Sequence, residues 1–229
     1  MSATRVAVIG AGGRMGRFAS ELLAESREFE LVARLGRGTE LANALRECGA
    51  EIGLDLTAAG LGAKHGALLL ECGLRPVIGT SGVTRAETAE LDRRARALGL
   101  GGIVVPNFSM GMLCLQRAAE EFVRSFPDVA IVELHHERKK DAPSGTALDT
   151  RERLLAAGAR APLPIQSVRL PGLYAHQELH FGAPGETLTL RHDMHGPAAF
   201  APGLLAALRF ARTASGVAHG LEAALPRAL

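Results

Sequence analysis

One stretch of the chain, Glu133 to Leu148, concentrates side chains that could do chemistry: ELHHERKKDAPSGTAL. It contains two adjacent histidines, His135 and His136, and a lysine, Lys139, four positions after the first histidine. Imidazole and ammonium groups are common general acids and bases, and a cation also attracts an anionic substrate. The stretch therefore indicates a site for an anion that is protonated during its reaction.

The same stretch ends with the pattern of a helix start. Ser144 has the residue type of an N-cap, and the backbone amides of Gly145 and Thr146 in the first turn could receive an anion. With the cationic side chains before it, this pattern favours a substrate that carries carboxylates. From these residues alone, a charged surface loop with incidental histidines stays open as the alternative.

The spacing of the two histidines limits what they can do. Neighbours in a regular strand point to opposite faces, so the strand must end or bulge there if both serve one pocket. Adjacent histidines lack the i, i+4 spacing of a helical zinc site, and no carboxylate completes an HExxH motif. We therefore expect no metal.

A second motif with chemical meaning, VAVIGAGGRMGR, lies near the N-terminus. Its glycines form Gly-x-Gly from Gly10 and also Gly-x-x-Gly-x-x-Gly through Gly10, Gly13 and Gly16. Glycine permits a positive φ and lets the backbone approach a pyrophosphate at the N-terminus of a helix. Because an apolar strand precedes the motif and an amphipathic helix follows it, the motif predicts a dinucleotide site. A structural turn without a ligand is the alternative.

The end of the second predicted strand bears on the choice of dinucleotide. A carboxylate there would accept hydrogen bonds from the adenosine ribose of NAD, whereas an arginine would pair with the 2′-phosphate of NADP. Here Arg34 and Arg37 flank Gly36, and no carboxylate stands at the strand end. The sequence predicts that NADPH is preferred and that NADH is possible, with two solvated surface arginines as the alternative.

The elements that must position these motifs alternate along the first half of the chain. Apolar strand patterns at 5–9, 30–35, 52–57, 76–80 and 101–107 are separated by helical patterns at 14–25, 62–73 and 84–99. Repeated βα units of this kind predict a parallel sheet covered on both faces. Thr84 followed by Glu87 has the spacing of a capping box, which marks the start of the last of these helices.

The second half of the chain shows a different order of predicted helices and strands. We expect a helix at 112–126, a strand at 129–136, a helix from about Gly145, and strands near Ser167, Gln177 and Thr187 in a mixed or antiparallel sheet. A final helix is expected at 200–214. The predicted fold class is α/β, in which an N-terminal Rossmann-type parallel-sheet domain carries an inserted α+β mixed-sheet domain. Residues 1–108 and 200–229 would bind the dinucleotide, and residues 109–199 would bind substrate and form the oligomer.

Composition excludes several other classes. The chain has 229 residues and a formal net charge of +2, with one Tyr and no Trp, so it lacks the charge and aromatic rings of a nucleic-acid-binding protein. No signal peptide or membrane span is apparent, so a cytoplasmic location is expected. Cys48, Cys72 and Cys114 are odd in number and have no ligand spacing, which favours reduced thiols.

The sequence resembles the 4-hydroxy-tetrahydrodipicolinate reductases, also called dihydrodipicolinate reductases, of the diaminopimelate and lysine pathway. Their signature is similar to ELHHERKKDAPSGTAL at almost every position. The resemblance extends over nearly the whole chain in the motifs VAVIGAGGRMGR, LDLT, IGTSG, PNFSMGM, FGAPGETLTLRHD and FAPGLLAAL. It implies NAD(P)H-dependent reduction of 4-hydroxy-tetrahydrodipicolinate, a small dicarboxylate, to tetrahydrodipicolinate in a homotetramer.

The resemblance also implies roles for individual residues. His135 would donate or accept a proton and Lys139 would donate one, while the substrate carboxylates would be held by His136, Ser144, Gly145 and Thr146. Three groups of residues would hold the cofactor: Gly10, Ala11, Gly12, Gly13, Arg14 and Met15 at the pyrophosphate; Gly36 and Arg37 at the adenosine ribose; Gly79, Thr80, Ser81, Val105, Pro106, Asn107 and Phe108 at the nicotinamide. One departure is the stretch from Arg37 to Leu54, which is shorter than in the family, so the crossover there must be abbreviated.

Two other hypotheses stay open from the sequence. Another imine or amino-acid dehydrogenase, such as an aspartate dehydrogenase, could share the scaffold but would not need the Ser-Gly-Thr segment. A non-catalytic NADP(H)-sensing protein would not need Lys139.

Overall fold

The computed structural model describes residues 2–225, and the chain divides into two compact units. Unit 1 contains the residues up to Phe108 and those from Phe200, and unit 2 is Ser109–Ala199. Residue 1 and residues 226–229, which the sequence assigned to the dinucleotide domain, lie outside the described residues.

Unit 1 is built on a parallel sheet. Within residues 2–225 this sheet has six strands in the order β10-β5-β4-β3-β1-β2, and every strand pair is parallel. The strands are β1 (Thr4–Ile9), β2 (Phe29–Leu35), β3 (Ile52–Asp55), β4 (Arg75–Ile78), β5 (Gly101–Val104) and β10 (Gly216–His219). Strands β3 and β5 are buried at every position, as strands covered on both faces must be.

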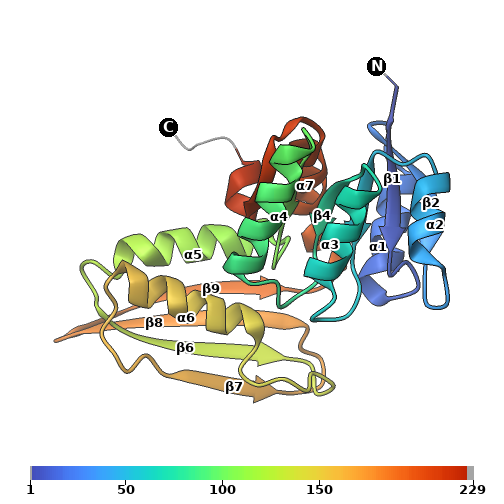
Figure 1. Ribbon diagram of the computed structural model, residues 1–229. Coiled ribbons are helices and arrows are strands. Elements are labelled where there is room, and N and C mark those ends of the chain that lie inside the picture. The colour runs from blue at the N-terminus through green and yellow to red at the C-terminus, as the bar shows by residue number, and fades with distance from the viewer. Residues whose placement is uncertain (1, 226–229) are drawn as a thin grey trace. The chain divides into compact units, whose positions relative to one another are not determined.

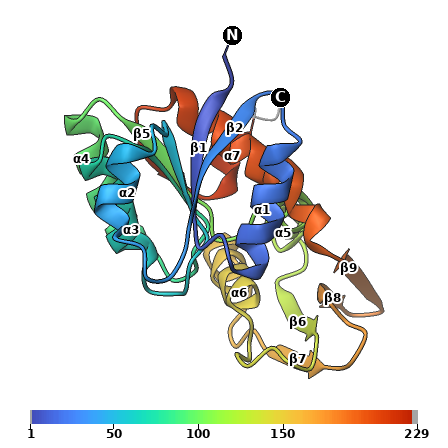
Figure 2. The same cartoon turned by 90° about the vertical axis from the view of Figure 1, so that its right-hand side faces the viewer.

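Helices cover both faces of this sheet (Figure 2). Helices α1 (Arg14–Ala24) and α7 (Ala201–Thr213) lie on one face, and α2 (Leu41–Glu47), α3 (Gly62–Glu71) and α4 (Arg85–Ala97) lie on the other. A short 3₁₀ helix, Leu221–Ala224, follows β10. The capping box of α4 is present, since the Thr84 hydroxyl accepts from Glu87 N and the Glu87 carboxylate accepts from Thr84 N. The final helix, α7, packs on β5 and β4.

Unit 2 pairs two helices with a mixed sheet (Figure 1). Strands β6 (Asp128–His135) and β7 (Ile165–Arg169) are parallel, while β6 with β8 (Ala175–Ala183) and β8 with β9 (Glu186–Met194) are antiparallel. Helices α5 (Met110–Phe122) and α6 (Gly145–Ala157) lie on one face of this sheet, and a 3₁₀ helix, Pro197–Phe200, follows β9. Val129 and Ile131 alternate with exposed or half-buried residues along β6 and face the helices. The parallel sheet and the mixed sheet confirm the predicted fold class.

Some predicted boundaries were wrong. The helix expected at 112–126 begins at Met110, where Ser109 caps it, and ends at Phe122. The strands β3, β4 and β5 end at Asp55, Ile78 and Val104, two or three residues before their predicted ends. The segment between β2 and β3 contains only the seven-residue helix α2, which was not predicted, nor was β10.

Candidate active site

The glycine turn follows β1, at the point in the sheet where the order of successive strands reverses. Strand β1 has β2 on one side and β3 on the other, which makes its carboxyl end a switch point of the kind where ligands bind. Gly10 has φ of +83°, and a Cβ there would lie 2.7 Å from the Leu56 carbonyl oxygen. A Cβ on Gly16 would lie 2.1 Å from the Gly10 carbonyl oxygen. Both positions therefore require glycine for the turn to form.

Gly12 differs from these two glycines. No atom lies within 4 Å of a Cβ built on it, and its φ is not positive, so the protein itself does not require glycine there. Helix α1 begins just after, with Gly13 as an N-cap that supplies no side chain and with no acidic residue in the first turn. An open backbone turn before a positive helix end fits a pyrophosphate. Ala11, Arg14 and Met15 belong to the same turn and first helical residues.

The two segments predicted to line the nicotinamide come together at the same edge of the sheet. Gly79 N donates to Asp55 O at 2.9 Å, and Val105 N donates to Ile78 O at 2.8 Å. A Cβ on Gly79 would lie 2.5 Å from the Phe108 ring, so this glycine makes room for the ring. Val105 and Phe108 are buried, Asn107 is half-buried, and Ser81 and Pro106 are exposed.

Thr80 belongs to a buried polar cluster that the sequence did not reveal. Its hydroxyl donates to Asp55 Oδ2 at 2.7 Å and accepts from Thr57 N at 3.0 Å. The Thr57 hydroxyl donates to Asp55 Oδ1 at 2.7 Å, and His65 Nδ1 lies 3.1 Å from the same oxygen. Because its hydrogen is donated to Asp55, the Thr80 hydroxyl could contact a nicotinamide only as an acceptor.

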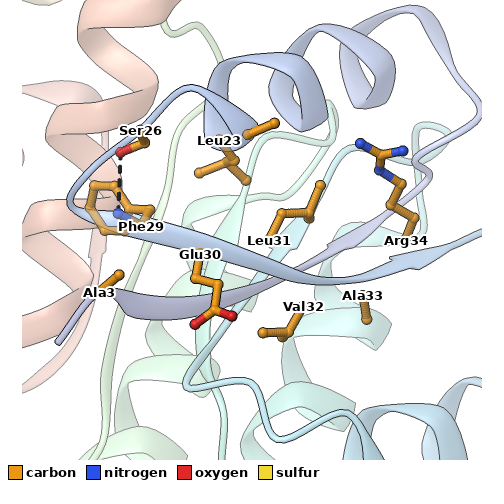
Figure 3. A pocket seen from close by; sticks show the side chains of 10 residues that line it. Ala3, Leu23, Ser26, Phe29, Glu30, Leu31, Val32, Ala33 and Arg34 are labelled. Atoms are coloured by element: carbon orange, nitrogen blue, oxygen red, sulfur yellow. Dashed lines mark hydrogen bonds between the residues drawn. The ribbon is translucent and has the colours of Figure 1, made fainter.

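Gly36 and Arg37 are exposed and follow the last residue of β2, which is an edge strand. A cavity of about 670 Å³ lies along this strand. In Figure 3, the side chains of Glu30 and Arg34, which line it, point to opposite sides of β2. Among the residues that line this cavity, only Arg34 was considered in the sequence-based prediction of which dinucleotide binds. No residue assigned to the dinucleotide turn lines this cavity, so it is separate from the predicted pyrophosphate site.

In unit 2, the stretch Glu133 to Leu148 includes the end of strand β6 and the start of helix α6. Strand β6 ends at His135, and His136 begins a turn in which Lys139 N donates to His136 O at 3.1 Å. The strand thus stops between the two histidines, which frees His136 from strand alternation. Ser144 is the N-cap of α6, accepting from Ala147 N at 3.2 Å, as predicted. Gly145 and Thr146 form the first turn.

Glu133, for which the sequence predicted no role, is fully buried beside His135. His135 Nδ1 lies 2.5 Å from Glu133 Oε2, and Arg169 donates to both carboxylate oxygens at 2.9 and 2.7 Å. Burial raises the pKa of the Glu133 carboxyl, but hydrogen bonds from Arg169, Ser167 and His135 outweigh it and hold this pKa below its usual value. Burial lowers the pKa of His135, against the raising effect of Glu133, and the charges of Lys139 and Arg169 lower it further.

Lys139 and His136, the other two side chains in this stretch that could do chemistry, have different surroundings. Lys139 Nζ donates to both carboxylate oxygens of Asp141 at 2.9 and 2.8 Å, and its side chain is about one-fifth exposed. His136 Nδ1 is buried and has no hydrogen-bond partner among residues 2–225. Buried polar atoms nearly always have a hydrogen-bond partner, so this unpaired ring nitrogen fits a position that binds a polar group of a ligand. The stretch from His135 to Thr146 thus contains a cation, two imidazoles and a helix N-terminus.

Residues 2–225 contain no group of three or more His, Cys, Asp or Glu side chains that could hold a metal ion. None of the helices in that range is long and apolar enough to cross a membrane.

The fold and the glycine turn define a two-domain α/β protein of the dinucleotide-binding class, and comparisons identify its family. Residues 4–108 match the family "Dihydrodipicolinate reductase, N-terminus" and residues 110–225 match "Dihydrodipicolinate reductase, C-terminus". The chain belongs to the dihydrodipicolinate reductase family. This confirms the resemblance stated from the motifs.

Individual relatives agree with this assignment. The chain is 41% identical to the 4-hydroxy-tetrahydrodipicolinate reductase of Lactococcus lactis subsp. cremoris MG1363, covering 95% of this chain and 96% of the relative. It is 37% identical to the enzyme of that name from Coxiella burnetii Dugway 5J108-111, over 96% and 98%. A solved structure, dipicolinate-bound dihydrodipicolinate reductase from Paenisporosarcina sp. TG-14, superposes with a TM-score of 0.84 at 30% identity, over 97% of this chain and all of that one.

Proposed function

We propose that this protein reduces 4-hydroxy-tetrahydrodipicolinate to tetrahydrodipicolinate in lysine and diaminopimelate biosynthesis, with NADPH preferred and NADH accepted. One observation carries the proposal beyond family membership. The His135–Glu133 pair, Lys139 and the N-terminus of α6 are adjacent in unit 2, which is the set that a dicarboxylate undergoing protonation requires. The names of the relatives supply the substrate.

Each of these residues has a task in that reaction. Ser144, Gly145 and Thr146 at the start of α6, with His136, bind the substrate carboxylates through donors and the helix dipole. The bound nicotinamide supplies hydride to the conjugated imine that forms when the substrate loses water. Lys139 donates the proton that neutralises the charge developing on the substrate, and His135 donates or accepts a proton beside it.

The cofactor is assigned to unit 1. The open turn at Gly12 and the uncapped start of α1 bind the pyrophosphate, and the segments 79–81 and 105–108 contact the nicotinamide. Arg37, exposed just after β2 beside Gly36, pairs with the 2′-phosphate of NADPH. The absence of a carboxylate at that strand end supports the preference.

The oligomer is proposed to form through the second sheet. Ala130, Val132 and Leu134 alternate with the core residues of β6, so they point away from α5 and α6. An apolar row on a sheet face without helices of its own unit favours burial against another copy. We propose a cytoplasmic homotetramer, which sedimentation and light scattering of the purified protein would test.

A coupled assay tests the reaction. The preceding synthase generates the substrate, and the loss of reduced-nicotinamide absorbance is followed with NADPH and NADH in parallel. Lys139→Ala should lower kcat by on the order of 10²-fold or more, since general acid catalysis contributes about that much. Its dinucleotide Kd should match wild type, and Lys140→Ala, a change at the exposed neighbouring lysine, should keep wild-type turnover.

Three results would contradict the proposal. Wild-type protein that binds NADPH but does not consume it with this substrate would favour a sensor. Turnover with oxaloacetate and ammonia instead would favour an aspartate dehydrogenase. Full turnover of Lys139→Ala would remove that residue from the mechanism.

A further inference from the structure

We propose that Glu133 and Arg169 are positioning residues, an ion pair with a fully buried carboxylate and a partly buried guanidinium that fixes the tautomer of His135 and ties it to the start of α6. The inference rests on the proposed role of His135 in proton transfer. Neither residue carries the chemistry itself, and each acts through the groups to which it is hydrogen-bonded.

The surroundings of Glu133 determine which ring nitrogen of His135 carries hydrogen. Oε2 accepts from Arg169 and lies 2.5 Å from His135 Nδ1, and Oε1 accepts from Arg169 and from Ser144 N at 3.2 Å. A carboxylate held ionised by a guanidinium can only accept hydrogen bonds. Nδ1 of His135 must therefore be the protonated nitrogen of the neutral ring, which leaves Nε2 as the nitrogen that exchanges a proton with substrate.

Arg169 extends the pair to the rest of the signature stretch. Arg169 lies on β7 directly beside His135 in the parallel register, although the two residues are 34 positions apart in the chain. One of its nitrogens also donates to the Asp141 carbonyl oxygen at 2.7 Å, and the Asp141 carboxylate holds Lys139. One buried ion pair thus contacts His135, the N-cap of α6 and the turn that carries Lys139.

The location of the pair argues for positioning more than for stability. A buried ion pair can often be replaced by apolar residues without loss of stability, because desolvation offsets the attraction. Glu133 is fully buried on β6, with Val129 and Ile131 on the same face in the apolar core of the unit. An apolar residue there would satisfy packing but would leave His135 free to adopt the other tautomer.

The charges around His135 predict what removal of Glu133 would do. Glu133 faces the imidazole from its own strand, Arg169 from β7, and Lys139 from the following turn, where Asp141 partly neutralises it. Without the Glu133 charge, two cations would face the ring, so its charged form would be disfavoured. In a plot of kcat against pH, the change in kcat that reports the protonation of His135 should then occur at lower pH than in wild type.

Glu133→Gln is the direct test, with Glu120→Gln as its matched control. Glu120 pairs with Arg153 between α5 and α6 of the same unit, outside the stretch from His135 to Thr146. Glu133→Gln should lower kcat by on the order of 10²-fold, within the range of general acid–base catalysis, with KM changed less than about threefold. Glu120→Gln should keep the wild-type kcat and pH profile. Nitrogen NMR of His135 should show Nδ1–H in the neutral wild-type ring and a mixture of tautomers in Glu133→Gln.

A second variant is needed as a control, because Glu133→Gln leaves the Arg169 charge unpaired and could lower kcat by misfolding alone. Glu133→Gln/Arg169→Met removes both charges and should fold, yet show the same loss of kcat and the same mixture of tautomers. A folded double variant with wild-type kcat, or a wild-type His135 protonated on Nε2 when neutral, overturns the inference. The NMR result does not depend on turnover, so a wild-type protein inactive on this substrate would contradict the proposed function alone.

Discussion

Two glycines of the N-terminal turn should separate the stability of the fold from the affinity for dinucleotide. Gly12 and Gly16 are four residues apart, and both would become alanine in the test. A Cβ on Gly16 would lie 2.1 Å from the Gly10 carbonyl oxygen and 2.7 Å from Ala11 Cα, both backbone atoms that cannot rotate away. A Cβ on Gly12 would meet no atom within 4 Å.

The expected magnitudes follow from these distances. Gly16→Ala must push α1 away from the turn, and overpacking of this kind costs about 2 kcal/mol. For a chain of this length that cost lowers Tm by roughly 4–8 °C. Gly12→Ala should stay within about 0.5 kcal/mol of wild type, as exposed substitutions usually do. It should still weaken NADPH binding about tenfold, equivalent to roughly 1.4 kcal/mol, because the methyl would stand where the pyrophosphate approaches the backbone.

The assay combines thermal unfolding without ligand and isothermal titration with NADPH for the two variants and wild type. The reasoning predicts a crossed pattern, in which Gly16→Ala loses stability and Gly12→Ala loses affinity without losing stability. If Gly12→Ala bound NADPH as tightly as wild type, the pyrophosphate could not lie against that turn. If Gly16→Ala kept the wild-type Tm, the packing of α1 on the Gly10 carbonyl would be refuted.

Three further predictions concern specificity, capping and pH. Arg37→Ala should raise KM for NADPH about tenfold, since a charge-assisted hydrogen bond contributes roughly 1.5 kcal/mol, and should leave KM for NADH nearly unchanged; equal effects on both would contradict the 2′-phosphate assignment. Thr84→Ala removes the N-cap of α4 and should lower the free energy of unfolding by about 1 kcal/mol in urea titrations without altering either KM. Burial lowers the pKa of His135 and of His192 below the ordinary 6.5, so the unfolded chain takes up protons there before the folded one does. Tm should therefore fall as pH is lowered from about 6.5 towards 5, and a flat Tm over this interval would show that these rings are not buried in their neutral forms.

The elements that the sequence predicted correctly are those with a local signal. Apolar β-branched runs and helical spacing are read within one element, so β1, β2 and α3 were found close to their true bounds. The capping box at Thr84 and the N-cap at Ser144 depend on side chains three residues from the backbone groups that they satisfy. Such contacts form wherever that local sequence folds as a helix.

The elements that the sequence missed depend on distant partners. Strand β10 was not predicted, and it is defined by its pairing with β5, which lies more than a hundred residues earlier in the chain. Helix α2 begins at Leu41 without a side-chain cap and runs for only seven residues. The ion pair between Glu133 and Arg169 was missed for the same reason, since Arg169 reaches Glu133 only through the parallel register of β6 and β7.

The two buried carboxylates, Asp55 and Glu133, show a shared principle in the two units. Each ends or nearly ends a strand, each is fully buried, and each accepts hydrogen bonds from a segment that the sequence assigned to chemistry: Thr80 in unit 1, His135 and Ser144 in unit 2. A buried acid is costly unless its oxygens are satisfied, and apolar residues would fill the same volume at less cost. Their position at strand ends is better explained by the loops that they restrain. Because hydrogen bonds to a buried carboxylate are directional, a small displacement of the loop would leave an oxygen unpaired, which holds each loop in one geometry.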